Sequence, residues 1–184
     1  MSRSHDTSAA PRIIIARHGE PDADRRERLD WRGYERWWAG YDEAGLRAGA
    51  TRLYASTLPR AIETAQAAAP ERELILDSMF VEAPLPPPQI PGRFTARTWG
   101  VFARCSWWLG HSRGRETRGQ AERRAEQAAD QLIEASREGT VALFAHGWFN
   151  RMLRPALARR GWRCVRDGGD WYWSWRAYTL KNPR

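Results

Sequence analysis

Short apolar runs alternate with amphipathic stretches along most of the chain. Four runs are rich in aliphatic residues and end at polar or turn residues, which is typical of strands buried in a sheet. A further stretch alternates between apolar and polar residues, as a strand with one buried face does. The strands predicted in this way are residues 12–16, 53–56, 74–76, 141–145 and 171–179.

Helical periodicity separates most of these runs. The clearest case is 118–137, where Thr117 and Gln120 form a capping-box pattern and Gly139 supplies a stop. In 94–109 the stripe Phe94, Val101, Phe102, Cys105, Trp108 and Leu109 predicts a helix whose apolar face, Trp108 included, is buried. The remaining predicted helices are a short one at 43–48, one at 58–69 with Ser56 or Thr57 as N-cap and Pro59 in its first turn, and one at 148–159.

Strands that alternate with helices favour an α/β fold, in which helices cover both faces of a mostly parallel sheet. The chain has 184 residues, which suits one domain. We expect residues 1–11 to form a disordered lead and residues 12–184 a single domain. The five prolines in 83–92 predict an irregular segment there.

Composition narrows the class of protein without choosing a function. The net charge is +8, almost all of it from arginine, which favours an anionic partner such as a phosphorylated substrate. The basic stretches 115–124 and 154–166 are more typical of solvated faces than of a nucleic-acid groove. No apolar window has the length of a membrane span, and the first residues lack the apolar core of a secretion signal. Two cysteines without metal-ligand spacing suit a reducing compartment, so we expect a cytoplasmic protein.

Two histidines stand directly after predicted strands. His18 follows the run 12–16 after one arginine, and His146 follows 141–145 at the start of a helix. Ligands of α/β sheets bind outside the carboxyl ends of the strands, so the two histidines are predicted to face one crevice. Arg60 lies in the first turn of the 58–69 helix, where its charge opposes the helix dipole unless an anion is bound there.

At this point the sequence resembles the histidine phosphatase (phosphoglycerate mutase-like) superfamily. The similar segments are IIIARHGEP at 13–21, LYASTLPRAIETA at 53–65, FVEAPLP at 80–86 and VALFAHGWFNRML at 141–153. The resemblance implies a three-layer α/β/α fold with a mostly parallel central sheet. It also implies a phosphatase of the metal-independent histidine acid phosphatase type, without a cofactor, that acts on a phosphorylated small molecule or a phosphoprotein.

The resemblance further implies a role for each matching residue. His18 is the nucleophile that becomes phosphorylated, His146 stabilises the transition state, and Glu82 is the general acid. Glu20 and Asp22 are rival acids. The residues implied to bind the substrate phosphate are Arg17, Arg60, Gly19 and Gly147.

Three alternatives remain open from the sequence. A mutase is one, although the proline-rich segment after Glu82 lacks the pattern of phosphoglycerate mutases, which favours hydrolysis. A second is a non-catalytic phosphate-binding domain that acts through a partner, and a third is a nucleic-acid binder. Among the eleven tryptophans, Trp37, Trp38, Trp99 and Trp107 lie in segments that border the predicted crevice, where packing is favoured over substrate stacking. We expect His5 to be disordered and His111 to be exposed.

Overall fold

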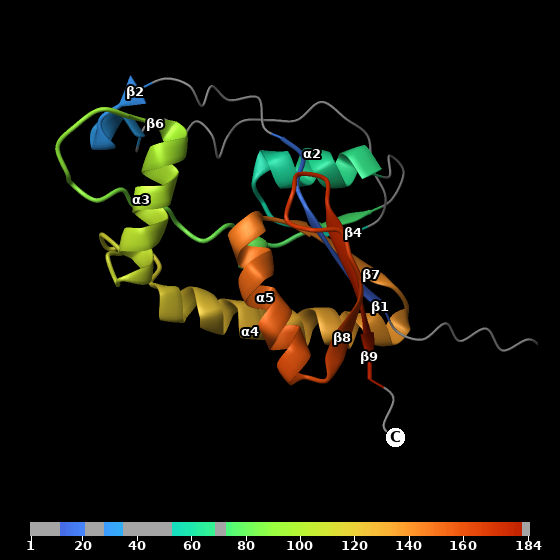
Figure 1. Cartoon of the computed structure of the whole chain (residues 1–184). Helices are drawn as coiled ribbons and strands as arrows, with labels where there is room; N and C mark the ends of the chain where they lie inside the picture. The colour runs from blue at the N-terminus through green and yellow to red at the C-terminus, as the bar shows by residue number, and fades with distance from the viewer. Residues whose placement is uncertain (1–11, 21–27, 35–52, 69–72, 182–184) are drawn as a thin grey trace, which may run out of the picture.

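The computed structural model describes residues 12–20, 28–34, 53–68 and 73–181. The predicted lead 1–11, the predicted helix at 43–48, and His5, Asp22, Trp37 and Trp38 lie outside the described residues. The helices and strands are arranged around one sheet (Figure 1).

A six-stranded mixed sheet forms the centre of the molecule, with the strand order β5-β4-β7-β1-β9-β8. The first four strands in this order pair in parallel, and β9 and β8 add an antiparallel edge. The strands are β1 (Arg12–Arg17), β4 (Leu53–Ala55), β5 (Leu74–Leu76), β7 (Val141–Ala145), β8 (Trp162–Asp167) and β9 (Trp175–Leu180). The mostly parallel sheet is thus confirmed.

The last part of the chain differs from the sequence prediction. The strand expected at 171–179 begins only at Trp175, because 171–174 form a turn. The edge strand β8 was not predicted, since five of its six residues are exposed and its sequence WRCVRD has no apolar run.

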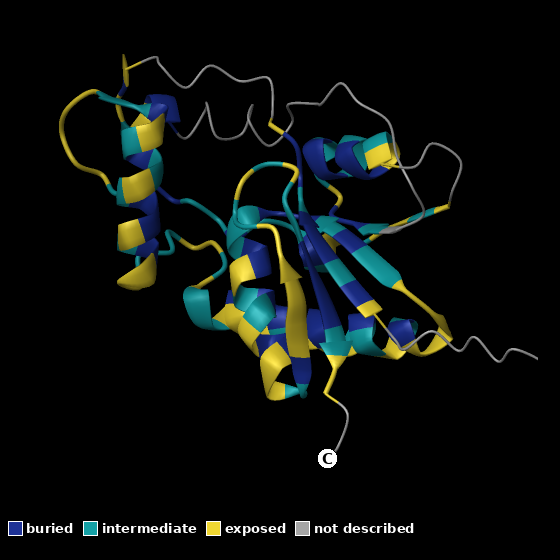
Figure 2. Ribbon diagram, turned by 45° about the vertical axis from the view of Figure 1, so that its right-hand side comes forward, coloured by how far each residue is buried: buried dark blue, intermediate teal, exposed yellow. Residues whose placement is uncertain are grey.

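Helices cover both faces of the sheet. On one face, α4 (Arg118–Ala135) and α5 (Gly147–Arg159) pack on Ile13, Ile15 and Leu143 to form the main hydrophobic core. The other face carries α2 (Pro59–Ala68), which contacts β4, β5 and β7. The predicted capping box at Thr117 and Gln120 is present. Buried residues line the inner sides of these helices (Figure 2), so the three-layer architecture is confirmed.

Helix α3 (Ala96–Trp108) stands apart from these layers (Figure 1). It packs in a small core of its own with β2 (Arg28–Leu29), β6 (Phe94–Thr95) and the helical residues 31–34. The predicted helix is present, but the prediction of its buried face was wrong: Trp108 is 45% exposed and Leu109 90%. The buried residues are instead Ala96, Trp99, Ala103, Arg104 and Trp107.

Candidate active site

Two histidine rings meet at the carboxyl ends of neighbouring strands. Strands β1 and β7 run in parallel with Arg17 beside Ala145, so the next residue of each strand enters the same space. The ring centroids of His18 and His146 lie 5.0 Å apart. The predicted convergence of the two histidines is therefore present.

The backbone fixes the orientation of the His18 ring. The imidazole is 3% exposed, and its Nδ1 lies 2.6 Å from the carbonyl oxygen of Gly19. A carbonyl oxygen only accepts hydrogen bonds, so Nδ1 carries the proton and the lone pair of the neutral ring is on Nε2.

His146 is held in its neutral form. The side chain is fully buried, and its Nε2 lies 2.8 Å from the hydroxyl oxygen of Ser56. Burial, followed by the charges of Arg60, His18 and Arg17, holds the pKa of His146 well below its usual value. Because His146 is neutral while the arginines beside it are charged, the group carries a net positive charge. An incoming anion offsets that charge.

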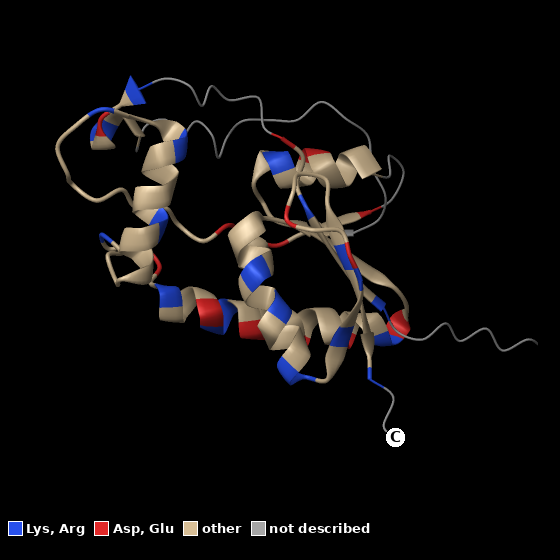
Figure 3. Cartoon of the chain, in the orientation of Figure 1, with Lys and Arg blue, Asp and Glu red and all other residues tan. Residues whose placement is uncertain are grey.

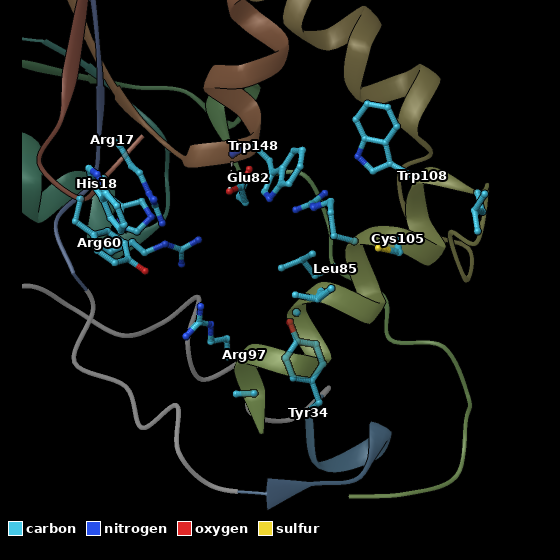
Figure 4. A pocket seen from close by; sticks show the side chains of 17 residues that line it. Arg17, His18, Tyr34, Arg60, Glu82, Leu85, Arg97, Cys105, Trp108 and Trp148 are labelled. Carbon is cyan, nitrogen blue, oxygen red and sulfur yellow. Dashed lines mark hydrogen bonds between the residues drawn. The ribbon is translucent and has the colours of Figure 1, made fainter. Parts of the chain in front are cut away.

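Two arginines supply those cations. Arg60 is 0% exposed at the N-terminal end of α2, which excludes a solvated surface role. Arg17 donates a hydrogen bond of 2.6 Å from Nη1 to the carbonyl of Asp170, and its guanidinium lies 4.0 Å above the ring of Tyr172. Both arginines line the same cavity as His18 (Figure 4).

Glu82 caps the helix that follows His146. Its Oε1 accepts hydrogen bonds of 2.9 Å from the backbone N–H of Phe149 and of Ala83, and its Oε2 accepts one of 3.2 Å from Trp148. The carboxyl group thereby occupies the N-terminus of α5 and still lines the cavity (Figure 4). Of its rivals, Glu20 is exposed and is not among the lining residues.

Gly19 and Gly147, both predicted to bind the substrate phosphate, make different contacts in the structure. The N–H of Gly19 donates to the hydroxyl of Thr64 at 2.9 Å, and the predicted phosphate contact of Gly19 stays a prediction. A side chain on Gly19 would meet the ring of Trp173 at 2.6 Å, which is the physical reason for glycine here. At Gly147 a Cβ would lie 3.3 Å from Nε of Arg17, and its predicted phosphate contact stays a prediction.

The turn between β8 and β9 completes the site, and the sequence analysis missed it. The ring of Tyr172 lies 5.5 Å from that of His18, and the backbone of Asp170 holds Arg17. The carboxylate of Asp170 in turn pairs with Arg151 and Arg176 at 2.9 and 2.8 Å. Two consecutive glycines at 168–169 were the available signal, because they mark a turn rather than a strand.

Helix α3 contributes a buried arginine to the cavity that His18 lines. Arg104 is 5% exposed, its guanidinium lies 4.9 Å from the ring of Trp107 and 4.6 Å from that of Trp148, and it donates to the carbonyls of Ala83 and Pro84 at 3.4 Å. Burial lowers the pKa of Arg104 to about 10, against the opposing effect of Glu82, so the group stays cationic at neutral pH.

Several sequence expectations concern residues beside this site. Trp99 and Trp107 are buried and serve packing, as favoured. His111 is partly buried in a loop rather than exposed. The basic stretches carry ion pairs to carboxylates, Arg124 with Glu116 and Arg160 with Asp130, as solvated faces do (Figure 3).

Within the described ranges, no group of three or more His, Cys, Asp or Glu residues is arranged to hold a metal ion. In the same ranges, no helix has both the length and the apolar character needed to cross a membrane.

Solved structures with a similar fold are phosphatases. A mycobacterial glucosyl-3-phosphoglycerate phosphatase in complex with VO3 matches with a TM-score of 0.56 and 20% identity over 94% of this chain and 98% of the other. An ecdysone phosphate phosphatase from Bombix mori in complex with tungstate matches with a TM-score of 0.53 and 15% identity over 94% and 92%. A phosphoserine phosphatase from Entamoeba histolytica gives 0.50 and 18% over 80% of each chain.

The sequence itself matches a family model. No curated protein matches the chain. The model of the histidine phosphatase superfamily (branch 1) matches residues 13–166, which include every residue of the histidine and arginine cluster. The chain belongs to this superfamily, as the four sequence segments indicated.

Proposed function

We propose that this histidine phosphatase superfamily member hydrolyses a phosphomonoester through a phosphohistidine on His18. The observation that supports it most directly is the pair of imidazoles 5.0 Å apart, of which His18 lines a cavity together with Arg17 and Arg60 while His146 is buried directly behind it. A nucleophile, a second imidazole and two fixed cations around one oxyanion-sized space are the parts that such a reaction needs.

In the first step, Nε2 of His18 attacks phosphorus and the bond from phosphorus to the ester oxygen breaks. Glu82 gives its proton to that oxygen, so the alcohol leaves neutral and the carboxylate remains. The Nδ1 proton stays on the hydrogen bond to Gly19, which keeps the attacking nitrogen unprotonated before the reaction.

In the second step, a water molecule attacks the phosphohistidine. Glu82 takes one proton from the water, the P–N bond breaks, and inorganic phosphate leaves with His18 restored. Splitting one displacement into two lets the same carboxyl group serve first as acid and then as base.

Fixed charge lowers the barrier of both steps. The phosphoryl oxygens carry negative charge throughout, and buried cations stabilise it more strongly than solvated ones because water screens them less. Arg60 is fully buried and Arg17 is held by the Asp170 carbonyl, so neither has to reorganise during the reaction. These groups take the place that a metal ion has in other phosphatases, so we propose a metal-independent reaction.

The test is hydrolysis of phenyl phosphate with brief acid-quench trapping. We expect release of inorganic phosphate, acid-labile label on the wild-type protein, unchanged rates with a chelator, and no label on His18→Gln. Rates that fall on chelation would contradict the metal-independent reaction. Isomerised ester in place of free phosphate would indicate a mutase, and phosphate binding without turnover would indicate a binding domain.

A further inference from the structure

The cavity that His18 lines extends well beyond a phosphoryl group. Its volume is about 1390 Å³, and it runs from His18 and Arg60 to the outer face of α3. Figure 4 shows His18, Arg17 and Arg60 on one side of this space and Leu85, Trp108 and Trp148 across it. Only one end of the cavity is needed for the phosphate.

The far side of the cavity carries a group of apolar side chains, here called the α3 wall, and Arg97 and Arg104 of α3 line the cavity beside it. Exposed large apolar side chains gathered in one place indicate a binding surface, whereas single ones do not. In the α3 wall Val101 is 56% exposed, Trp108 45% and Leu109 90%. The α3 wall consists of Leu85, Val101, Cys105, Trp108, Leu109 and Trp148.

Aromatic stacking holds this wall in place. The rings of Trp108 and Trp148 meet edge to face with centroids 6.3 Å apart. Arg118 lies 3.8 Å above the ring of Trp108, and Arg104 and Arg151 lie 4.6 and 4.7 Å from that of Trp148. Rings fixed in this way present a preformed apolar surface, which costs little conformational entropy when a ligand binds.

We infer that the α3 wall binds the leaving group of the substrate, and that the preferred substrates are phosphomonoesters of large apolar, aromatic alcohols. The inference rests on the proposed phosphatase reaction, and continuity with the catalytic residues carries it. Figure 4 shows Glu82 beside Trp148, across the cavity from His18 and Arg60, and Oε2 of Glu82 accepts a hydrogen bond from the N–H of Trp148. An alcohol that Glu82 protonates as it leaves therefore lies next to Trp148 and the α3 wall. A small hydrophilic alcohol would leave the apolar surface in contact with water.

The kinetic test compares leaving groups of nearly equal acidity but different size. Phenyl phosphate and 4-biphenylyl phosphate serve, with phosphoserine as the small polar substrate and a phosphotyrosyl peptide as the protein-like one. We expect kcat/KM to be at least about tenfold higher for the biphenylyl ester than for the phenyl ester. Equal values, or a preference for phosphoserine or the peptide, would overturn the inference while leaving phosphatase activity established.

Two valines of similar exposure, one in the α3 wall and one outside it, test whether the wall causes the higher kcat/KM for the biphenylyl ester. Val101 in the wall and Val165 on β8 are 56% and 51% exposed, and only Val101 lines the cavity. We expect Val101→Ala to lower the ratio of biphenylyl to phenyl kcat/KM about fivefold and Val165→Ala to leave the ratio unchanged. A ratio that both variants change equally, or neither changes, would contradict the assignment.

The two cysteines give a readout that does not depend on turnover. Both are free and exposed, but Cys105 lies in the α3 wall and Cys164 does not. We expect biphenyl-4-ylphosphonate to slow alkylation of Cys105 by iodoacetamide, and phenylphosphonate or inorganic phosphate to slow it far less, with Cys164 unaffected. Equal slowing of both cysteines, or none, would overturn the inference. Protection of Cys105 without hydrolysis of any ester would contradict the proposed function alone.

Discussion

The catalytic end of the cavity and the α3 wall are built on opposite principles. At the catalytic end the charged and polar groups are buried, with Arg60 and His146 both 0% exposed. In the α3 wall the apolar groups are exposed, as Trp108 and Leu109 are. Each region reverses the usual distribution of polar and apolar side chains. The buried cations suit an anionic ligand, and the exposed apolar groups suit an apolar one.

If the proposed function holds, this difference places chemistry and substrate choice on separate parts of the fold. The catalytic groups stand at the ends of β1 and β7, where the register of a parallel sheet fixes their spacing. Helix α3 belongs to its own small core around Trp99 and Tyr34. Trp107 of α3 also packs with Ala83, Ala121 and Trp148. Only changes on the exposed face of α3, such as those at Val101, are therefore expected to alter the proposed leaving-group surface without moving the histidines.

The largest effect is expected from removing the nucleophile. His18→Ala should lower kcat/KM for phenyl phosphate by at least about 10³-fold, because no other group at the catalytic end can form the phosphoenzyme. His111→Ala, outside the cavity lining, is the control and should keep wild-type activity. A fully active His18→Ala variant would show that the chemistry takes place elsewhere. The contrast between the catalytic end and the α3 wall would then no longer hold.

Two of the arginines that line the cavity, Arg60 and Arg97, sharpen the contrast between buried and exposed charge. Arg60→Gln should lower kcat by about 10²–10³-fold, since a buried cation is poorly screened. Arg97, exposed on α3, lines the same cavity, and Arg97→Gln should cost only a few-fold. Steady-state kinetics on phenyl phosphate measures both values of kcat. If kcat falls equally in the two variants, burial does not determine how much each charge contributes to catalysis.

The sequence could predict the catalytic end because its information is local. A strand followed by Arg17 and His18, and another followed by His146, place groups at known ends of parallel strands whatever surrounds them. The capping box at Thr117 and the proline at the start of α2 are local in the same sense. These features need no knowledge of distant packing.

The α3 wall was not predictable in that way. The helix has large apolar residues on two faces, Val101 and Trp108 on one and Trp99 and Trp107 on the other, so periodicity alone does not choose the buried one. Tyr34 and Leu29, more than sixty residues earlier, decide it by packing on Trp99. The Thr64 partner of Gly19 is likewise a long-range contact.

The close approach of Gly19 to Trp173 predicts a smaller effect at the junction of the two regions. A methyl group at Gly19 would lie 2.6 Å from the indole ring and would displace the turn that carries Tyr172 and Asp170. Gly19→Ala should therefore cost about 1–3 kcal/mol of stability and lower kcat. Urea denaturation measures the first effect.

The matched control is Gly119→Ala on α4, where only the end of the Arg123 side chain lies near, at 3.6 Å. This variant should gain about 0.5–1 kcal/mol from the higher helix propensity of alanine. If both variants were equally stable, the tight contact at Gly19 would not constrain the turn.

The smallest expected effect is the pH dependence of the free energy of unfolding, which differs between the two regions. The folded-state pKa of His146 lies well below its usual value, mainly through burial, so the unfolded chain binds its proton first as pH falls. Stability contributed by neutral His146 is therefore complete above the unfolded pKa of about 6.5 and is lost below it, at up to about 1.4 kcal/mol per pH unit. Arg104 of α3, with a pKa of about 10, keeps its charge throughout this range. Between pH 6.5 and 5.5 the free energy of unfolding should thus fall by about 1 kcal/mol more in the wild type than in His146→Gln, because the unfolded histidine is half protonated at the start of this interval. Equal pH slopes in urea denaturation would mean that His146 titrates alike in both states, and its placement among buried cations would then be wrong.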